Sequence, residues 1–239
     1  MKILFSLLYM ISLCKIQAVR KANYSRINML TVNEIFASIQ GESTFAGLPF
    51  VFVRLTGCNL RCKYCDTRYA YDEGQLSSVE EIVEKVREYE IPRVCVTGGE
   101  PLLQPETLEL LDKLIDAKFL VTLETNGSIA VDKVNEKVHI ILDVKTPGSG
   151  EIDKNLLENL QKLKQKDEVK FVITDKKDYH WAKEIISKHD LTNITQVLFS
   201  PCAGSINVHM LADWIVEDRL DCRLNLQLHK IIWGNMRGK

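Results

Sequence analysis

The chain has 239 residues, of which 46% are hydrophobic and 26% are charged, and its net charge is −1 from 31 basic and 32 acidic side chains. This length is compatible with one α/β domain, and the composition is that of an ordinary globular protein. Such a balanced charge provides no field that attracts nucleic acid or an anionic membrane. We therefore expect a small-molecule substrate, with no nucleic-acid partner and no membrane partner.

The N-terminus differs in character from the rest of the chain. Residues 3–14 read ILFSLLYMISLC and are similar to the apolar region of a signal peptide. The stretch is too short for a membrane-spanning helix, which needs about 20 apolar residues. Met29 offers a second possible start. We predict an extension at 1–28 followed by one domain at 29–239. The extension is open to three interpretations: an upstream addition or mis-assigned start, a targeting segment, or a structural helix.

The cysteine content indicates a metal site rather than disulfides. Three of the seven cysteines lie within residues 58–65, too close together to crosslink a chain of this size. Clustered cysteines in a large α/β chain more often bind metal, so we expect a reducing compartment and a cytoplasmic protein. Cys95, Cys202 and Cys222 stand singly and are interpreted as packing residues.

Hydrophobic patterns predict strands that alternate with helices. The expected strands are 32–39, 50–56, 93–97, 119–123, 138–144, 169–174, 197–200 and 224–228, and the expected helices are one that opens at Ser77-Ser78, then 105–117, 155–163, 179–188 and 208–220. Glu80 and Glu81 complete a capping-box pattern at the first of these helices. The alternation favours right-handed βαβ units. Because the helices are too few for eight units, the predicted α/β fold is an incomplete, modified TIM-like barrel with a mostly parallel sheet.

Polar segments follow the predicted strands at their C-terminal ends. They are the cysteine segment, Gly98-Gly99-Glu100, Glu124-Thr125-Asn126, Lys145-Thr146-Pro147, Ser200-Pro201 and His229-Lys230. In parallel barrels this edge builds the active site. The sequence therefore predicts that these segments meet in one site.

The spacing Cys58-x3-Cys62-x2-Cys65 predicts an iron–sulfur cluster. Three ligands leave one iron open for an external chelate, whereas a structural zinc site is closed by four protein ligands. A zinc module with a distant fourth ligand remains the alternative.

This spacing resembles the radical S-adenosylmethionine superfamily, and Thr97-Gly98-Gly99-Glu100-Pro101 is similar to its second signature. The resemblance implies a 4Fe-4S cluster whose open iron chelates S-adenosylmethionine. It also implies that Gly98, Gly99 and Glu100 bind the methionine part of that cofactor. A glycyl-radical activating enzyme would share these motifs and is a second alternative.

Residues 32–69, VNEIFASIQGESTFAGLPFVFVRLTGCNLRCKYCDTRY, closely resemble the 7-carboxy-7-deazaguanine synthase family. Ser43 departs from the glycine that often follows Gln-Gly-Glu in that family. The resemblance implies radical ring contraction of 6-carboxy-5,6,7,8-tetrahydropterin to 7-carboxy-7-deazaguanine and ammonia, in queuosine biosynthesis. It further implies Mg²⁺, regeneration of S-adenosylmethionine in each turnover, an electron donor such as flavodoxin or ferredoxin, and a homodimer.

Site residues are carried over by motif position, and no catalytic residue is assigned. Gln40 and Glu42 are expected to contact the pterin, and Arg54 its carboxylate. Thr67 matches the magnesium ligand. Glu124 and Asn126 are assigned to the cofactor, and the remaining substrate candidates are Thr97, Lys145 and His229.

Overall fold

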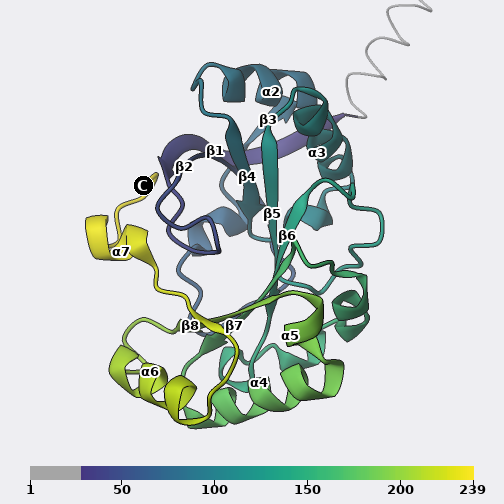
Figure 1. Cartoon of the computed structure of the whole chain (residues 1–239). Helices are drawn as coiled ribbons and strands as arrows, with labels where there is room; N and C mark the ends of the chain where they lie inside the picture. Colours follow the sequence, from purple (N-terminus) through teal and green to yellow (C-terminus); the bar gives the residue numbers. More distant parts are fainter. Residues whose placement is uncertain (1–27) are drawn as a thin grey trace, which may run out of the picture.

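The computed structural model describes residues 28–239, and a nine-stranded sheet runs through them in the order β3-β1-β2-β4-β5-β6-β7-β8-β9 (Figure 1). The strands are β1 (Met29–Ile39), β2 (Pro49–Leu55), β3 (Gln75–Ser78), β4 (Arg93–Gly98), β5 (Leu120–Thr125), β6 (His139–Val144), β7 (Glu168–Ile173), β8 (Gln196–Pro201) and β9 (Arg223–Leu224). The predictions for residues 1–27 lie outside the described residues, and the domain boundary stays a prediction.

The sheet is open and mostly parallel. β1 runs antiparallel to both of its neighbours, β2 and β3, and every other neighbouring pair is parallel. β3 and β9 are the two edges, so the barrel does not close. The predicted incomplete barrel is confirmed. The short edge strand β3 was not predicted because its sequence, QLSS, contains a single apolar residue.

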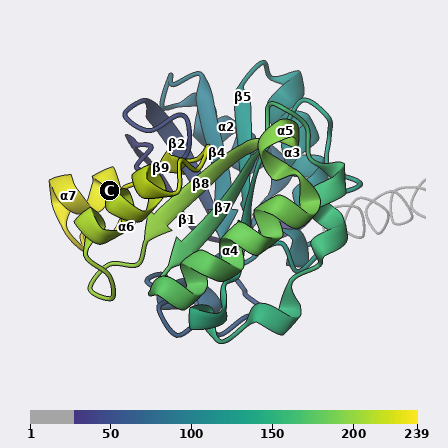
Figure 2. The same ribbon diagram turned by 60° about the horizontal axis from the view of Figure 1, so that its bottom comes forward.

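Helices cover the outer face of the sheet in two groups (Figures 1 and 2). α2 (Val79–Arg87) and α3 (Thr107–Asp116) pack on the first strands, whereas α4 (Lys176–His189) and α6 (Val208–Glu217) pack on the later ones. A short helix, α5 (Leu191–Ile194), follows α4. Each group has its own hydrophobic core.

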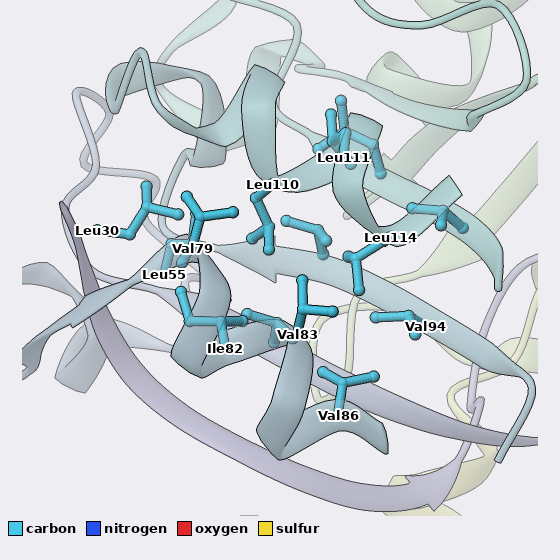
Figure 3. Close-up of a cluster of buried hydrophobic side chains, with 14 of the residues drawn as sticks. Leu30, Leu55, Val79, Ile82, Val83, Val86, Val94, Leu110, Leu111 and Leu114 are labelled. Atoms are coloured by element: carbon cyan, nitrogen blue, oxygen red, sulfur yellow. The ribbon is translucent and has the colours of Figure 1, made fainter. Parts of the chain in front are cut away.

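The first core joins α2 and α3 to the sheet. Figure 3 shows side chains of both helices pointing into one cluster; those labelled are Val79, Ile82, Val83, Val86, Leu110, Leu111 and Leu114. Full burial of such a side chain contributes about 1.5–3 kcal/mol. The capping box at α2 is confirmed, because the Ser78 hydroxyl accepts from the Glu81 N–H and Glu81 accepts from the Ser78 N–H. The helical spacing of the apolar residues predicts the packed face of α2 correctly, whereas in α3 the fully buried leucines are Leu110, Leu111 and Leu114 and Leu108 is only partly buried.

The predicted helix at 155–163 is wrong. The chain instead forms two 3-10 turns, η4 (Ile152–Lys154) and η5 (Leu157–Lys162). The side-chain amide of Asn155 bonds both to the main-chain N–H and to the carbonyl of Lys145, and that of Asn159 bonds the carbonyls of Gly127 and Ile129. Asparagine side chains that bond main-chain groups in this way compete with α-helix formation.

The predicted last strand, 224–228, is also largely wrong. β9 pairs over two residues, after which Leu228 donates its N–H to the Gly41 carbonyl at 2.9 Å and begins helix α7 (Leu228–Trp233). This bond draws the chain from the sheet edge toward the β1–β2 loop. His229 consequently lies in the first turn of a short helix, not at a strand end.

The β1–β2 loop, residues 40–48, lies against the inner face of the sheet. The Thr44 N–H donates to the buried Glu168 carboxylate of β7 at 3.0 Å, and the Phe45 ring packs on the His139 ring at 4.9 Å. Ser43 has a φ of 67°. This left-handed conformation explains why glycine suits the position, because a Cβ there is disfavoured by about 1–2 kcal/mol. The loop thus reaches from β1 and β2 across the inner face of the open sheet to β6 and β7.

Two glycines let the end of β4 approach the end of β2. A Cβ on Gly98 would lie 2.2 Å from the Leu55 carbonyl oxygen, and one on Gly99 would lie 2.1 Å from that of Gly57 and 2.7 Å from the Cys58 Cβ. All three distances are far below van der Waals contact. Only glycine therefore permits this packing under the cysteine loop, defined as residues 57–67.

Within residues 28–239, no helix combines the length and apolar character needed to cross a membrane.

We predict that Gly99→Ala displaces the cysteine loop. The added methyl group collides with main-chain atoms that cannot rotate away, so the free energy of unfolding should fall by about 1–3 kcal/mol. Chemical denaturation measures this change. Gly204→Ala measures backbone strain without a collision, since φ there is 77° and a Cβ meets nothing within 4 Å; it should lose about 1–2 kcal/mol and leave the cysteine loop in place. A Gly99→Ala variant as stable as the unmodified protein would show that close packing at Gly99 is not required.

Candidate functional site

A cavity of about 850 Å³ opens at the C-terminal ends of the strands. Its size lies in the upper range of small-molecule sites. Of the predicted site residues, all except Glu100 line it: Gln40, Glu42, Arg54, Cys58, Cys62, Cys65, Thr67, Thr97, Gly98, Gly99, Glu124, Asn126, Lys145 and His229. Residues as far apart in sequence as Gln40 and His229 therefore meet in one site.

The three clustered thiols enter the cavity from the cysteine loop. Cys58, Cys62 and Cys65 are each half-buried. Burial raises the pKa of Cys58, and raises that of Cys62 to about 11, so both groups are protonated thiols at neutral pH until a metal displaces the proton. Within the described part of the chain, no three or more His, Cys, Asp or Glu side chains are arranged as a single-ion site.

The surroundings of Cys58 fit a cluster ligand. The Leu60 N–H donates to the Cys58 sulfur at 3.4 Å, and the Asn126 side-chain amide lies 3.9 Å from the same atom. N–H donors to ligand sulfurs are typical of iron–sulfur sites and tune their potential. Gly98 and Gly99 keep the adjacent backbone free of side chains. The donor set and the open space beside it fit a 4Fe-4S cluster with a bound chelate.

Glu100 has a different position from the one expected. Its side chain is 0% exposed and accepts from the Asn126 N–H at 2.7 Å, the Leu102 N–H at 3.0 Å and the Thr125 hydroxyl at 2.9 Å. Burial raises the pKa of Glu100. The carboxyl group connects the ends of β4 and β5 and so orients Asn126, rather than facing the cavity.

Polar side chains of the β1–β2 loop, β4 and β5 meet in the interior of the cavity. The Glu124 carboxylate accepts from the Thr97 hydroxyl at 2.9 Å and from the Gln40 amide at 3.4 Å. The Gln40 carbonyl oxygen in turn accepts from the Glu42 N–H at 3.1 Å. This network orients Gln40 and leaves a set of acceptor oxygens in the cavity wall.

Glu42 belongs to a buried network of charges. Its carboxylate pairs with the Lys170 ammonium at 2.8 Å and accepts from the Gln227 amide at 2.7 Å. Lys170 also lies 3.3 Å from Asp143, which pairs with Lys145 at 3.0 Å.

The charges in this network hold one another ionised. Burial by itself would raise the pKa of Glu42, but Lys170 outweighs it and lowers that pKa. Burial would likewise lower the pKa of Lys170, but Glu42 and Asp143 raise it well above its ordinary value. Glu42 is therefore an ionised acceptor with a fixed orientation.

Arg54 lies inside the cavity rather than at an edge, because β2 is flanked by β1 and β4. Its Nε donates to Glu34 at 2.8 Å, and its guanidinium carbon lies 5.8 Å from the Phe36 ring and 5.9 Å from the Tyr69 ring. Within residues 28–239 the two terminal nitrogens have no hydrogen-bond partner. The guanidinium is thus positioned by aromatic rings and one carboxylate while two donors stay available.

Thr67 and His229 stand at the mouth of the cavity. The Thr67 hydroxyl donates to Asp66 at 2.9 Å, and Asp66 pairs with Lys230 at 2.5 Å. Burial would raise the pKa of Asp66, but Lys230 lowers it to about 2. The His229 ring packs so closely on Gly41 that a Cβ there would lie 2.0 Å from Nδ1. Burial lowers the pKa of His229, which favours the neutral imidazole.

Sequence reasoning missed four polar residues that shape the cavity: Asp66, Asp143, Lys170 and Gln227. A signal existed for Lys170, because a charge within the apolar run of β7, EVKFVI, is unusual for a strand buried on both faces. Among the cysteines interpreted as packing residues, Cys95 lies in the core, whereas the buried Cys202 also lines the cavity.

Comparison with known proteins places this site in a family. Residues 52–173 match the model of the radical SAM superfamily. The 7-carboxy-7-deazaguanine synthase of Chlorobaculum tepidum is 44% identical over 86% of this chain and 94% of its own length. The enzyme of the same name from Koribacter versatilis is 40% identical over 85% of this chain and 97% of its own length.

A solved structure supports the fold. QueE from Escherichia coli matches with a TM-score of 0.71 over 84% of this chain and 95% of that chain, at 22% identity. The curated relatives carry the argument beyond the fold, because their identity is high and extends over nearly the whole of each protein. They disfavour both the activating enzyme and the zinc module. The chain therefore belongs to the 7-carboxy-7-deazaguanine synthase family of the radical S-adenosylmethionine superfamily.

Proposed function

We propose that this chain converts 6-carboxy-5,6,7,8-tetrahydropterin to 7-carboxy-7-deazaguanine and ammonia, a step of 7-deazapurine (queuosine) biosynthesis. The observation that carries the proposal is one cavity that combines three cluster-type thiols with an acceptor-rich wall and an arginine, in a chain 44% identical to an enzyme of that name. The substrate and the deazaguanine product are both heterocyclic carboxylates, which such a cavity suits.

Membership of the radical SAM superfamily implies a 4Fe-4S cluster and S-adenosylmethionine. When bound, they would supply the electron and the radical chemistry that open the reaction. The chain's own contribution is to hold the cluster through Cys58, Cys62 and Cys65. Gly98 and Gly99 at the end of β4 carry no side chain. They therefore leave room beside the cysteine loop for the methionine part of S-adenosylmethionine.

We assign recognition of the pterin ring to Gln40 and Glu42. Glu124, which the sequence assigned to the cofactor, is proposed as a pterin contact instead, because its carboxylate bonds the substrate candidates Gln40 and Thr97. The amino and ring N–H groups of a pterin are donors, and an ionised carboxylate accepts from two of them at once. Glu42 meets this need because Lys170 keeps it charged and Gln227 fixes its orientation. Thr97, Lys145 and His229 complete the set of proposed substrate contacts.

We assign the substrate carboxylate to Arg54. A guanidinium binds a carboxylate through two parallel N–H bonds, which a lysine cannot reproduce. The terminal nitrogens of Arg54 are available for this role, while its Nε is used by Glu34. The partly aromatic surroundings strengthen the interaction by excluding water.

Magnesium is proposed to bind at Thr67. Magnesium commonly takes only one or two protein oxygens and keeps several waters, and substrate oxygens complete its shell. The Thr67 hydroxyl lies at the cavity mouth beside the ionised Asp66, which supplies nearby negative charge. The ion would orient the substrate and offset its charge.

Three further features belong to this proposal. The electron is supplied by a protein such as flavodoxin or ferredoxin, the enzyme is a homodimer, and it works in the cytoplasm, where a reducing environment keeps cluster thiols reduced.

The first prediction from the proposed function concerns the cluster ligands. Alanine at Cys58, Cys62 or Cys65 should abolish iron binding and reductive cleavage of S-adenosylmethionine, because each removes one thiolate ligand. Alanine at Cys95, Cys202 or Cys222 should leave the iron content unchanged. Iron analysis after anaerobic reconstitution measures both sets. Iron retained in the Cys62 variant, or lost in the Cys202 variant, would refute the assignment.

The second prediction concerns Arg54. Arg54→Lys keeps the positive charge but loses the pair of parallel guanidinium N–H donors. One charge-assisted hydrogen bond contributes about 1.5–3 kcal/mol to binding. The substrate affinity should therefore fall about ten- to hundredfold, with S-adenosylmethionine affinity unchanged. Isothermal titration with each ligand tests this.

The control for that experiment is Glu34→Gln. It removes the ion pair between Arg54 and Glu34 but leaves the two terminal N–H groups of Arg54 in place. It should weaken substrate binding far less than Arg54→Lys. Equal weakening of both ligands in Arg54→Lys would indicate a folding defect and contradict the carboxylate assignment.

The third prediction concerns Thr67. Thr67→Ala should still bind iron and S-adenosylmethionine but should lose most of the stimulation of turnover by magnesium, because the hydroxyl ligand is gone. Thr67→Ser keeps the hydroxyl and is the matched control. Turnover is measured against magnesium concentration. A wild-type magnesium dependence in the alanine variant would mean that the ion binds elsewhere.

A further inference from the structure

Arg237, near the end of the chain, binds residues that lie far from it in the sequence. Its guanidinium group donates to the Asn33 side-chain oxygen at 3.1 Å and pairs with Glu73 at 2.8 Å and Glu34 at 3.4 Å. The guanidinium carbon lies 4.1 Å from the centre of the Tyr69 ring. Figure 1 shows this end of the chain close to β1, which carries Asn33 and Glu34. An arginine in such a network is better fixed than one in an isolated surface ion pair.

Asn33 and Glu34 belong to a β-bulge in β1. The register with β2 shifts at this point, so that Asn33 is the extra residue of β1 and Glu34 stands opposite Arg54. A bulge changes the direction of neighbouring side chains and is common beside active sites. The Arg54 Nε donates to Glu34 at 2.8 Å across the two strands. Arg237 therefore holds both residues of the bulge that places Glu34 against Arg54.

The two carboxylate oxygens of Glu34 have different partners. One oxygen accepts from the Arg54 Nε and from the Tyr69 hydroxyl, the latter at 3.2 Å. The other oxygen accepts from the Arg237 Nε. A carboxylate that is bonded at both oxygens has a fixed orientation, so Glu34 holds the Arg54 Nε at one point. The terminal nitrogens of Arg54 then keep a constant position for a bound carboxylate.

The charges around Arg54 balance only when Arg237 is present. Arg54 and Arg237 face the carboxylates of Glu34 and Glu73, which makes two positive and two negative charges. Asp72 is a further exposed acid. The Glu34 side chain is 15% exposed and that of Glu73 is 59% exposed, so water screens Glu34 less. Among these groups, removal of Arg237 leaves an excess of negative charge, which disfavours a carboxylate at Arg54.

We infer that Arg237 is a positioning residue for the substrate carboxylate and that it acts through Glu34 on Arg54. The inference rests on the proposed function, because it requires that Arg54 binds the carboxylate of the pterin. Arg237 fixes the orientation of Glu34, and its charge offsets the repulsion between the Glu34 carboxylate and that of the substrate. Among residues 28–239, Arg237 is not one of those that line the cavity, so it contributes without touching the substrate.

This role concerns selectivity for a carboxylate rather than binding in general. A tetrahydropterin with a methyl group at C6 offers the same ring to Gln40 and Glu42 but has no carboxylate for Arg54. The ratio of the affinities for the carboxylated and the methylated pterin therefore measures the Arg54 site. A partly unfolded variant binds less of both ligands, and the ratio is unaffected by that loss.

The experiment measures the binding of both pterins to the full-length, anaerobically reconstituted enzyme by isothermal titration. S-adenosylmethionine is present and reductant is omitted, so that no turnover occurs. The ligands are 6-carboxy-5,6,7,8-tetrahydropterin and 6-methyl-5,6,7,8-tetrahydropterin. Arg237→Ala should lower the affinity for the carboxylated pterin about three- to fivefold, the size expected when one partly exposed charge of a network is lost. The affinity for the methylated pterin should be unchanged.

Two single variants serve as controls. Arg237→Lys keeps the positive charge and should retain most of the preference for the carboxylated pterin. Arg87→Ala removes an arginine of similar exposure that pairs with Glu84 on the outer helix α2, and it should change neither affinity.

A double variant tests whether Arg237 acts through Glu34. In an enzyme that already carries Glu34→Gln, Arg237→Ala should reduce the preference for the carboxylated pterin far less than in the unmodified enzyme. The reason is that the carboxylate on which Arg237 acts is then absent. Such a loss of additivity is the mark of two residues that act together.

Several outcomes would overturn the inference. They are an unchanged preference in Arg237→Ala, equal weakening of both pterins, a preference in Arg237→Lys as low as in Arg237→Ala, the same loss in Arg87→Ala, or full additivity with Glu34→Gln. A failure of the proposed function appears separately, in the unmodified enzyme. It would show no preference for the carboxylated pterin, or would form no 7-carboxy-7-deazaguanine once a reductant is added.

Discussion

The buried ammonium group of Lys170 holds the inner face of the open sheet in its functional form. It lies 2.8 Å from Glu42 on the β1–β2 loop and 3.3 Å from Asp143 on β6. Removing charges from water costs several kcal/mol per ion, and a buried pair recovers this only with good geometry and further hydrogen bonds. Here Gln227 and Lys145 supply such partners. These partners offset the cost of burial, and the network fixes Glu42 and Asp143 in the cavity wall.

The β1–β2 loop depends on this interaction and on two others. Thr44 anchors the loop to Glu168 at the start of β7, and Gly41 accepts from Leu228 at the start of α7. Ser43 meanwhile tolerates a left-handed backbone conformation. Strained residues persist where the surrounding contacts determine their position. The loop is thus held from three directions, which explains how it can present Gln40 and Glu42 to the cavity in fixed orientations.

Close packing performs the corresponding task on the cluster side. Gly98 and Gly99 allow β4 to approach β2 and the cysteine loop, while the buried Glu100 carboxyl connects β4 to Asn126 at the end of β5. Asn126 then lies beside Cys58. One short segment therefore has two physical roles. Its glycines provide space, and its acid positions a neighbouring strand end, although all three residues belong to one sequence signature.

The sequence by itself determined the parts of this protein that depend on local spacing. The cysteine motif, the capping box of α2 and most of the alternation of strands and helices follow from residues close together in the chain, and the convergence of the parallel strand ends follows from that alternation. Only the tertiary structure decided that Lys170 faces Glu42, that Glu100 turns away from the cavity, and that the C-terminal segment forms α7 against Gly41. These arrangements depend on contacts between residues up to 187 positions apart, from Gly41 to Leu228, and local patterns carry no information about such contacts.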